Sequence, residues 1–185
     1  MPPEERQLLL DDRALARTLL RMAQDIVRQT PDPAHLVLIG VQRRGVELAA
    51  RLAAAITDLS GAEVARGAMD ITLYRDDLEV VGPKPIVGPT RLPVDLDGRP
   101  VWIVDDVLFT GRTVRAALDE LADFGRPARV GLAVLIDRGR REVPIQADVV
   151  GERVTTSADD RVEVFVRELD GRDAVELVHV VKVGA

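Results

Sequence analysis

Apolar residues in the first part of the chain recur three and four positions apart, from Leu15 to Val27. This spacing places them on one face of a helix. Asp11 and Asp12 favour the N-terminus of that helix, and Pro31 ends it. Two similar patterns further along the chain predict helices at about 45–57 and at 113–124.

Short runs of apolar residues alternate with these helices and are typical of strands buried on both faces of a parallel sheet. They predict strands at 36–40, 101–106 and 129–136, and β-branched and aromatic residues favour another at 68–74. In the last third of the chain, apolar and polar residues alternate, which predicts half-exposed antiparallel strands at 161–169 and 175–183. Together these elements predict an α/β sheet with an antiparallel edge.

The segment 75–98 interrupts this alternation, because it holds four prolines and three glycines. A segment of that length without regular structure is usually a functional loop or a disordered one. A chain of 185 residues fits one domain, so we expect a single domain over 1–185 with a mobile loop at 75–98.

The composition narrows the possible functions. The chain carries 25 basic and 31 acidic residues, a net charge of −6, so any nucleic-acid contact requires a local basic patch. The absence of cysteine excludes disulfides, thiol catalysis and cysteine-bound zinc. The sequence has no apolar run long enough to span a membrane and no signal-peptide pattern at its N-terminus. We therefore expect a cytoplasmic protein that does not contact membranes.

The richest chemistry lies in the run VWIVDDVLFTGRT, residues 101–113. A predicted buried strand ends in Asp105 and Asp106, and the residues 110–113 then open a helix. A helix N-terminus binds phosphate through free N–H groups, and Gly111 allows the backbone to approach closely. The two carboxylates suit hydroxyl groups, or a Mg²⁺ ion that the phosphate shares. Phosphate on one side and a diol on the other describe a ribose 5-phosphate.

The run 104–113 resembles the 5-phosphoribosyl-1-pyrophosphate (PRPP) signature of the type I phosphoribosyltransferases. With the segments 70–78, 124–145 and 150–157, the chain from about Leu8 onward resembles the bifunctional pyrimidine-operon regulators that are also uracil phosphoribosyltransferases. The resemblance implies an α/β type I phosphoribosyltransferase fold. In that fold, helices flank a central parallel sheet, and there is a small hood and an antiparallel C-terminal hairpin.

The resemblance also implies roles for residues that match the family's motifs. PRPP would be bound by Val41, Gln42, Arg43, Gly45, Val107, Leu108, Phe109, Thr110, Gly111, Arg112 and Thr113. The catalytic residues would be Asp105, Asp106, Arg44 and Arg75, and the turn from Val41 to Gly45, with Arg44, would hold the pyrophosphate. Uracil would contact Ile136, Asp137, Arg138 and Val154. Mg²⁺ is the implied cofactor, bound through PRPP, with Asp105 and Asp106 as candidate ligands.

In the implied reaction, a uracil nitrogen attacks C1 of PRPP, UMP forms and pyrophosphate leaves. This chemistry needs positioning, stabilisation of charge on the leaving group and exclusion of water. Asp106 is a candidate base, or an electrostatic partner of the cationic sugar. The family resemblance further implies a homodimer or a higher homo-oligomer.

Members of this family bind the leader RNA of the pyrimidine operon when UMP is bound. The candidate RNA-binding residues here are Arg17, Arg21, Arg140 and Arg141. An ordinary solvated helix face explains the first two equally well. The family usually has basic residues where Gln146 and Glu152 stand. Two alternatives therefore remain open: a uracil or purine salvage enzyme without RNA binding, and a UMP-sensing regulator without significant turnover.

Overall fold

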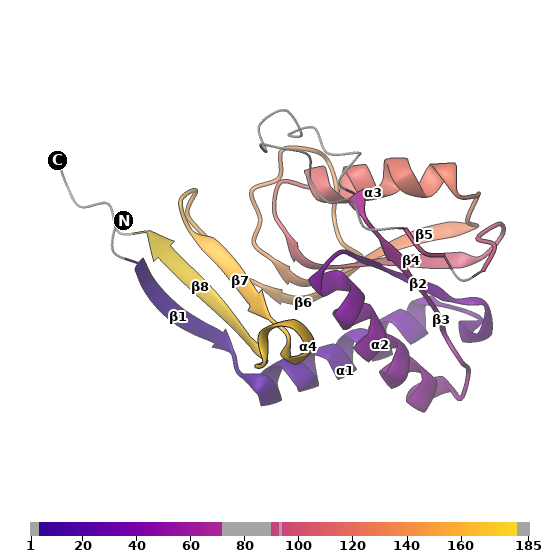
Figure 1. The fold of residues 1–185 in the computed structure, drawn as a ribbon, viewed down its shortest axis with the longest axis horizontal. Helices are drawn as coiled ribbons and strands as arrows, with labels where there is room; N and C mark the ends of the chain where they lie inside the picture. Colours follow the sequence, from indigo (N-terminus) through magenta and orange to yellow (C-terminus); the bar gives the residue numbers. More distant parts are fainter. Residues whose placement is uncertain (1–3, 72–89, 93, 181–185) are drawn as a thin grey trace.

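The computed structural model describes residues 4–71, 90–92 and 94–180, which form two sheets (Figure 1). The larger sheet has five parallel strands in the order β3-β2-β4-β5-β6, which confirms the predicted parallel sheet. Its strands are β2 Val37–Val41, β3 Ala65–Met69, β4 Pro100–Leu108, β5 Arg129–Asp137 and β6 Val149–Arg153.

Helices cover both faces of the parallel sheet (Figure 1). Along β4, Trp102 and Val104 contribute to the core shared with α1 and α2, whereas Val101 and Ile103 face the core shared with α3. Asp11 caps the first helix as predicted, since its carboxylate accepts the Ala14 N–H at 2.7 Å. The helices on these faces are α1 Asp12–Gln29, α2 Arg44–Ser60 and α3 Arg112–Asp123, and a 3₁₀ turn lies at Pro33–His35.

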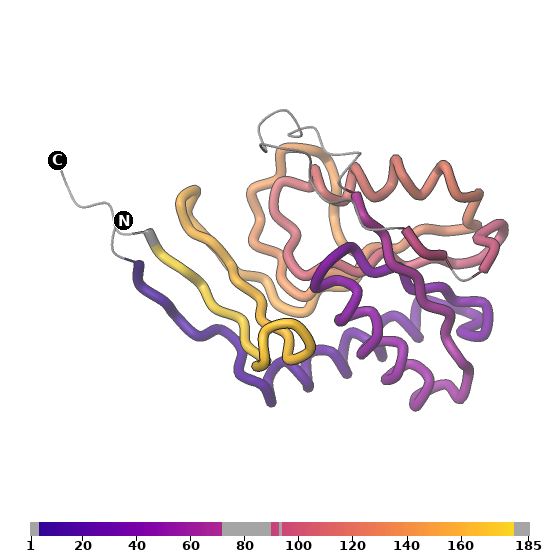
Figure 2. The backbone as a smooth tube through the Cα atoms, viewed as in Figure 1, coloured from indigo at the N-terminus to yellow at the C-terminus, as the bar shows by residue number. Residues whose placement is uncertain are grey.

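The smaller sheet is antiparallel and stands to one side of the larger one (Figure 2). Its strand order is β1-β8-β7, so it joins the start of the chain to its end. It is the expected hood, built from β1 Glu4–Leu10, β7 Arg161–Phe165 and β8 Ala174–Val180, with the short helix α4 Arg167–Asp170 between the last two.

Several predicted strands need correction. The C-terminal hairpin does not extend the parallel sheet as an edge, because β8 pairs with β1. The strand expected at 161–169 ends at 165, where α4 follows. The strand expected at 68–74 lies earlier, at 65–69, because its five residues pair in register with β2. The pattern of apolar and polar residues did not reveal β1 or β6.

The strand β4 is longer than predicted and runs to Leu108. Its pairing with β5 continues as far as the partners Leu108 and Asp137. Asp105 and Asp106 therefore lie within the C-terminal half of this strand and are not, as predicted, its last two residues. This places both carboxylates at the carboxyl edge of the parallel sheet, where ligands bind in open α/β folds.

Part of the predicted loop at 75–98 is ordered against the sheet. Arg91 forms a two-way backbone bridge with Ala68, with N···O distances of 2.9 and 2.8 Å, and Leu96 is fully buried. The rest of that loop, including Arg75, lies outside the described residues. No helix within the described ranges is both long and apolar enough to cross a bilayer.

Candidate active site

The two carboxylates at the end of β4 occupy different environments. Asp105 is 5% exposed, whereas Asp106 is partly exposed. Asp105 accepts the Asp106 N–H, and Asp106 accepts the Val107 N–H, both at 2.9 Å. Burial raises the pKa of Asp105 well above its usual range, and the adjacent charge of Asp106 raises it further. The protonated form of Asp105 is thereby favoured, and Asp106 lies on the accessible side.

The chain then turns through Thr110 and Gly111 into α3. Gly111 has φ +89°, a left-handed conformation that suits glycine, and α3 has no side-chain cap at this end. The turn is held from outside, because the Thr110 carbonyl accepts the N–H groups of Glu142 at 2.9 Å and Val143 at 3.2 Å. The structure therefore confirms a tight turn that presents a helix N-terminus at the sheet edge, as phosphate binding requires.

A second turn, from Val41 to Gly45, joins β2 to α2 beside the first one. A Cβ placed on Gly45 would lie 2.5 Å from the Val104 carbonyl oxygen, so the turn packs directly on β4. The peptide bond between Gln42 and Arg43 is cis, and the Gln42 N–H donates to the Met69 carbonyl at 2.9 Å. The topology therefore brings together the two turns to which the family resemblance assigned PRPP.

The two arginines of this turn differ. The side chain of Arg43 is exposed and makes no hydrogen bond or ion pair within the described parts of the chain. Arg44 binds the hood instead: its Nε and Nη2 donate to the two carboxylate oxygens of Asp170, at 3.3 and 2.9 Å. Burial alone would raise the pKa of Asp170, but the Val166 N–H and the Arg44 guanidinium together lower it. The sequence offered no signal for this pairing.

A pocket of about 360 Å³ lies between the end of β5 and the segment after β6. It joins three of the four residues predicted to contact uracil, and it lies next to the first turn, because the Arg138 N–H donates to the Leu108 carbonyl at 3.1 Å. Its lining residues are Asp137, Arg138, Gly139, Arg140, Arg153, Val154, Thr155 and Thr156.

Arg138 builds one wall of this pocket. Its Nε donates to Thr156 Oγ1 at 3.1 Å, its Nη2 donates to the Ser157 carbonyl at 3.2 Å, and its guanidinium lies 3.9 Å from the centre of the Phe109 ring. The predicted base contact Ile136 does not line the pocket, because alternation along β5 directs its side chain into the core. Thr156, which sequence reasoning missed, stands within the 150–157 segment that carried the family resemblance.

Two of the predicted RNA-binding arginines, Arg17 and Arg21, lie on α1, and the other two, Arg140 and Arg141, follow β5. Arg17 lies exposed on α1. Arg21 donates to the Val150 and Gly151 carbonyls and lies 3.8 Å from Glu152. Arg141 is bound internally, 2.7 Å from the Asp137 carboxylate and 2.8 Å from the Phe109 carbonyl. It therefore supports the turn and the pocket and is poorly placed to meet a phosphate.

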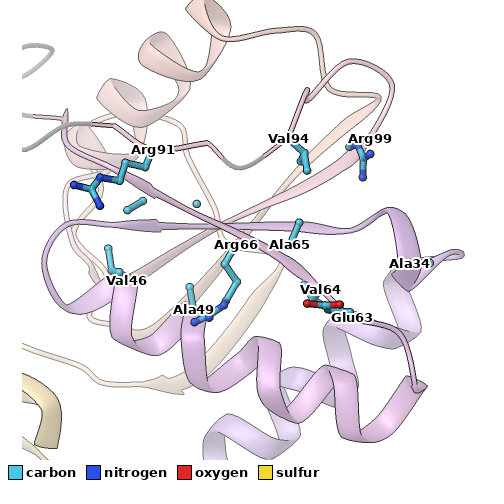
Figure 3. Close-up of a pocket in the computed structure, with 12 residues that line it drawn as sticks. Ala34, Val46, Ala49, Glu63, Val64, Ala65, Arg66, Arg91, Val94 and Arg99 are labelled. Carbon is cyan, nitrogen blue, oxygen red and sulfur yellow. The ribbon is translucent and has the colours of Figure 1, made fainter.

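The fourth of these arginines, Arg140, has φ 60° and donates to the Thr156 carbonyl at 3.2 Å. Arg140 thus belongs to the wall of the pocket that Arg138 lines. A separate pocket of about 680 Å³ lies along β3, and none of the residues predicted to bind PRPP or uracil lines it (Figure 3). Arg66, Arg91 and Arg99 stand around this second pocket.

Comparison with known proteins agrees with this geometry. Residues 6–169 match the family model of the phosphoribosyl transferase domain. The protein named bifunctional protein PyrR from Chloroflexus aurantiacus is 55% identical over 94% of this chain and 95% of its own length. The proteins of the same name from Thermus aquaticus and Deinococcus radiodurans are 52% and 51% identical, and both alignments cover 91% of this chain and 93% and 92% of those proteins.

Solved structures share the fold at low sequence identity. A hypoxanthine-guanine phosphoribosyltransferase from Bacillus anthracis has a TM-score of 0.70 at 21% identity, over 95% of this chain and 98% of that one. A hypoxanthine phosphoribosyltransferase from Trypanosoma cruzi has a TM-score of 0.69 at 20% identity, over 92% and 95% of the two chains. The family model covers most of the chain, and the relatives named above are more than half identical to it over nearly their whole length. This chain is therefore a type I phosphoribosyltransferase and belongs to the family of bifunctional PyrR proteins.

Proposed function

We propose that this protein converts uracil and PRPP to UMP and pyrophosphate, and that it controls pyrimidine genes by binding their leader RNA in response to UMP. One observation carries the enzymatic half. The acidic end of β4, the turn at 110–111 and the pocket behind Arg138 meet at one edge of the parallel sheet. The ribose hydroxyls fit the acidic end of β4, the 5-phosphate fits the turn, and the base fits the pocket.

The phosphate end of the substrate would be bound by backbone N–H groups. The turn at Thr110 and Gly111 presents the first turn of α3, and the hydrogen bonds from 142 and 143 keep it rigid. Arg112 donates from its Nε to Glu142 at 2.8 Å, so it buttresses this turn from the side. A preorganised turn binds a phosphate without a further entropy cost for ordering the loop.

The carboxylate pair would bind the ribose hydroxyls. Buried Asp105 accepts the Asp106 N–H and so orients its neighbour. Accessible Asp106 would accept hydroxyl hydrogen bonds and stabilise positive charge on the sugar as pyrophosphate leaves. The Asp106→Asn variant tests this role: we expect kcat to fall by at least about tenfold, and unchanged kcat and KM would remove Asp106 from the mechanism.

The pocket at the end of β5 would hold the base. Its lining includes Arg140, Thr155 and backbone groups, which suit the carbonyl oxygens and N–H of a pyrimidine, while Arg138 and Thr156 bind each other and fix the wall. The apolar side chain of Val154 lines the same space. Polar groups that would be left unpaired by the wrong base discriminate strongly between bases.

Mg²⁺ is the cofactor that this chemistry implies. In the described ranges, no three carboxylate or histidine side chains cluster as a cage for a metal ion. The site instead suits a Mg²⁺ ion that is bound mainly by oxygens of the substrate, with Asp105 and Asp106 as the adjacent protein carboxylates. When bound there, Mg²⁺ would neutralise charge on the pyrophosphoryl group.

A base panel tests the enzymatic half. Uracil, hypoxanthine, guanine and orotate are each incubated with PRPP and Mg²⁺, and release of pyrophosphate is measured. We expect turnover with uracil alone. Turnover with a purine would indicate a purine salvage enzyme, and tight UMP binding without turnover would indicate a regulator only.

The regulatory half rests on the basic face of α1. Arg13, Arg17 and Arg21 are spaced four residues apart, and all three are exposed. Binding of the leader RNA is measured with and without UMP across a salt series. We expect UMP to strengthen binding and the affinity to fall as salt rises, because arginine–phosphate contacts release counterions. Weak binding that ignores UMP would leave a uracil-salvage enzyme without the regulatory function.

A further inference from the structure

The hood is tied to the second turn by a single arginine–aspartate pair. Arg44 begins α2, and Asp170 ends α4, at a separation of 126 residues in sequence. The contact is bidentate and largely shielded, with the Arg44 side chain 35% exposed and the Asp170 side chain 19% exposed. Such two-point arginine–carboxylate pairs are the stronger and more specific ones.

Asp170 is held in place independently of Arg44. Its Oδ2 accepts the Val166 N–H at 2.8 Å, while its own N–H donates to the Val166 carbonyl at 2.8 Å. The carboxylate is therefore fixed at the turn between β7 and β8. It points at the arginine that matches the family's pyrophosphate-binding position.

A second link shows that the hood does not need Arg44 to stay attached to α2. Arg51 lies seven residues further along the same helix and binds Glu168 at 2.6 Å and Asp173 at 2.8 Å. Both arginines thus reach the same segment, 166–173. Only Arg44 also belongs to the turn between β2 and α2.

We propose that Asp170 competes with the pyrophosphoryl group of the substrate for Arg44, so that filling the turn at 41–45 releases the 166–173 segment of the hood from Arg44 and leaves it held by Arg51 alone. The inference deepens the proposed function, because it rests on pyrophosphate binding at this turn. A fixed carboxylate cancels most of the charge that Arg44 would offer to an anion, and it repels that anion directly. Occupancy of the site would thereby change how firmly the hood is bound.

Two matched variants separate this role from a merely structural one. Asp170→Asn keeps an oxygen that can accept the Val166 N–H, but it removes the negative charge that faces Arg44. Glu168→Gln weakens the neighbouring link to Arg51 and leaves the turn unchanged. Affinity for inorganic pyrophosphate, in excess Mg²⁺, is measured by calorimetry on each full-length protein.

We expect Asp170→Asn to bind pyrophosphate about fivefold to tenfold more tightly than the unmodified protein, and Glu168→Gln to bind it equally. Equal or weaker binding by Asp170→Asn would overturn the competition. In the unmodified protein, pyrophosphate should also speed hydrogen exchange in residues 166–173. Unchanged exchange there would overturn the release of the hood, and this measurement does not depend on the folding of any variant.

The unmodified protein distinguishes failure of this inference from failure of the proposed function. If it neither binds pyrophosphate nor forms UMP, both fall together. If it does both, but Asp170→Asn gains no affinity, the pair is a structural contact and the proposed enzymatic function stands.

Discussion

Replacement of Gly111 by alanine tests the assignment of the phosphate-binding turn. Gly111 has φ +89°, and a Cβ at this position would lie 2.7 Å from Val143 Cγ2 and 3.4 Å from Ile145 Cβ. Two costs therefore add: the left-handed backbone and the steric overlap with the 143–145 segment, which clamps the turn from outside.

The two costs can be sized separately. An alanine in the left-handed region costs about 1–2 kcal/mol. Overpacking a tight contact adds about 1–3 kcal/mol, because the neighbouring segment has to move. Gly61 provides a matched control, since its φ is +71° at the end of α2 and a Cβ added there would have no atom within 4 Å. We expect Gly61→Ala to cost about 1–2 kcal/mol and Gly111→Ala about 2–5 kcal/mol.

Urea unfolding of both variants gives the two free energies, and steady-state kinetics gives KM for PRPP. The Gly111→Ala variant should also raise KM for PRPP by roughly tenfold, because the shifted turn misplaces the N–H groups of α3. In the double variant Gly111→Ala, Val143→Ala the overlap is gone, so part of the lost stability should return. Equal costs at Gly61 and Gly111, with KM for PRPP unchanged, would refute both the packing account and the assignment of the turn.

Individual side chains give three further predictions. Glu120 is buried, and its Oε2 has no hydrogen-bond partner among the described residues. Burial, then the charges of Asp70 and Asp123, raise the pKa of Glu120 against the opposing Thr90 hydrogen bond, so the contribution of Glu120 to stability is lost as pH rises through its folded-state pKa. The Glu120→Gln variant should therefore gain about 1 kcal/mol over the unmodified protein at pH 8 and almost nothing at pH 4, as measured by urea unfolding. Arg138→Lys cannot reproduce the bonds to both Thr156 and Ser157, so KM for uracil should rise about tenfold while KM for PRPP stays unchanged in the same assay. Glu152→Lys removes the carboxylate beside Arg21, and filter binding should show tighter leader-RNA binding with a steeper salt dependence, whereas no change would place the RNA elsewhere.

Much of the fold and of the site follows from local patterns. The strand, turn and helix over 100–123 could be predicted because a buried apolar run, two carboxylates, a glycine turn and an amphipathic helix are all contiguous in the chain. The same holds for α1, whose apolar spacing and Asp11 cap are local features. Parallel pairing then brings the ends of β2, β4 and β5 to one edge by topology alone.

Prediction failed where a segment lacks a strong pattern of its own. The hood strand β1, EERQLLL, is mostly exposed and becomes a strand only because β8 supplies its hydrogen-bond partners. Residues 166–170 continue the alternating pattern of β7, yet they turn into α4, because Asp170 binds the Val166 N–H and Arg44. Long-range pairing decided both outcomes.

The amino-acid sequence by itself determined the fold class, the position of the PRPP signature and the family resemblance, because each rests on residues that are close together in the chain. Only the tertiary structure decided which of the neighbouring arginines are available. Arg43 is exposed, whereas Arg44 is paired with the hood and Arg141 is paired with Asp137. An arginine has the same charge wherever it stands, and its availability depends on the carboxylates and carbonyls that folding brings within about 3 Å of it.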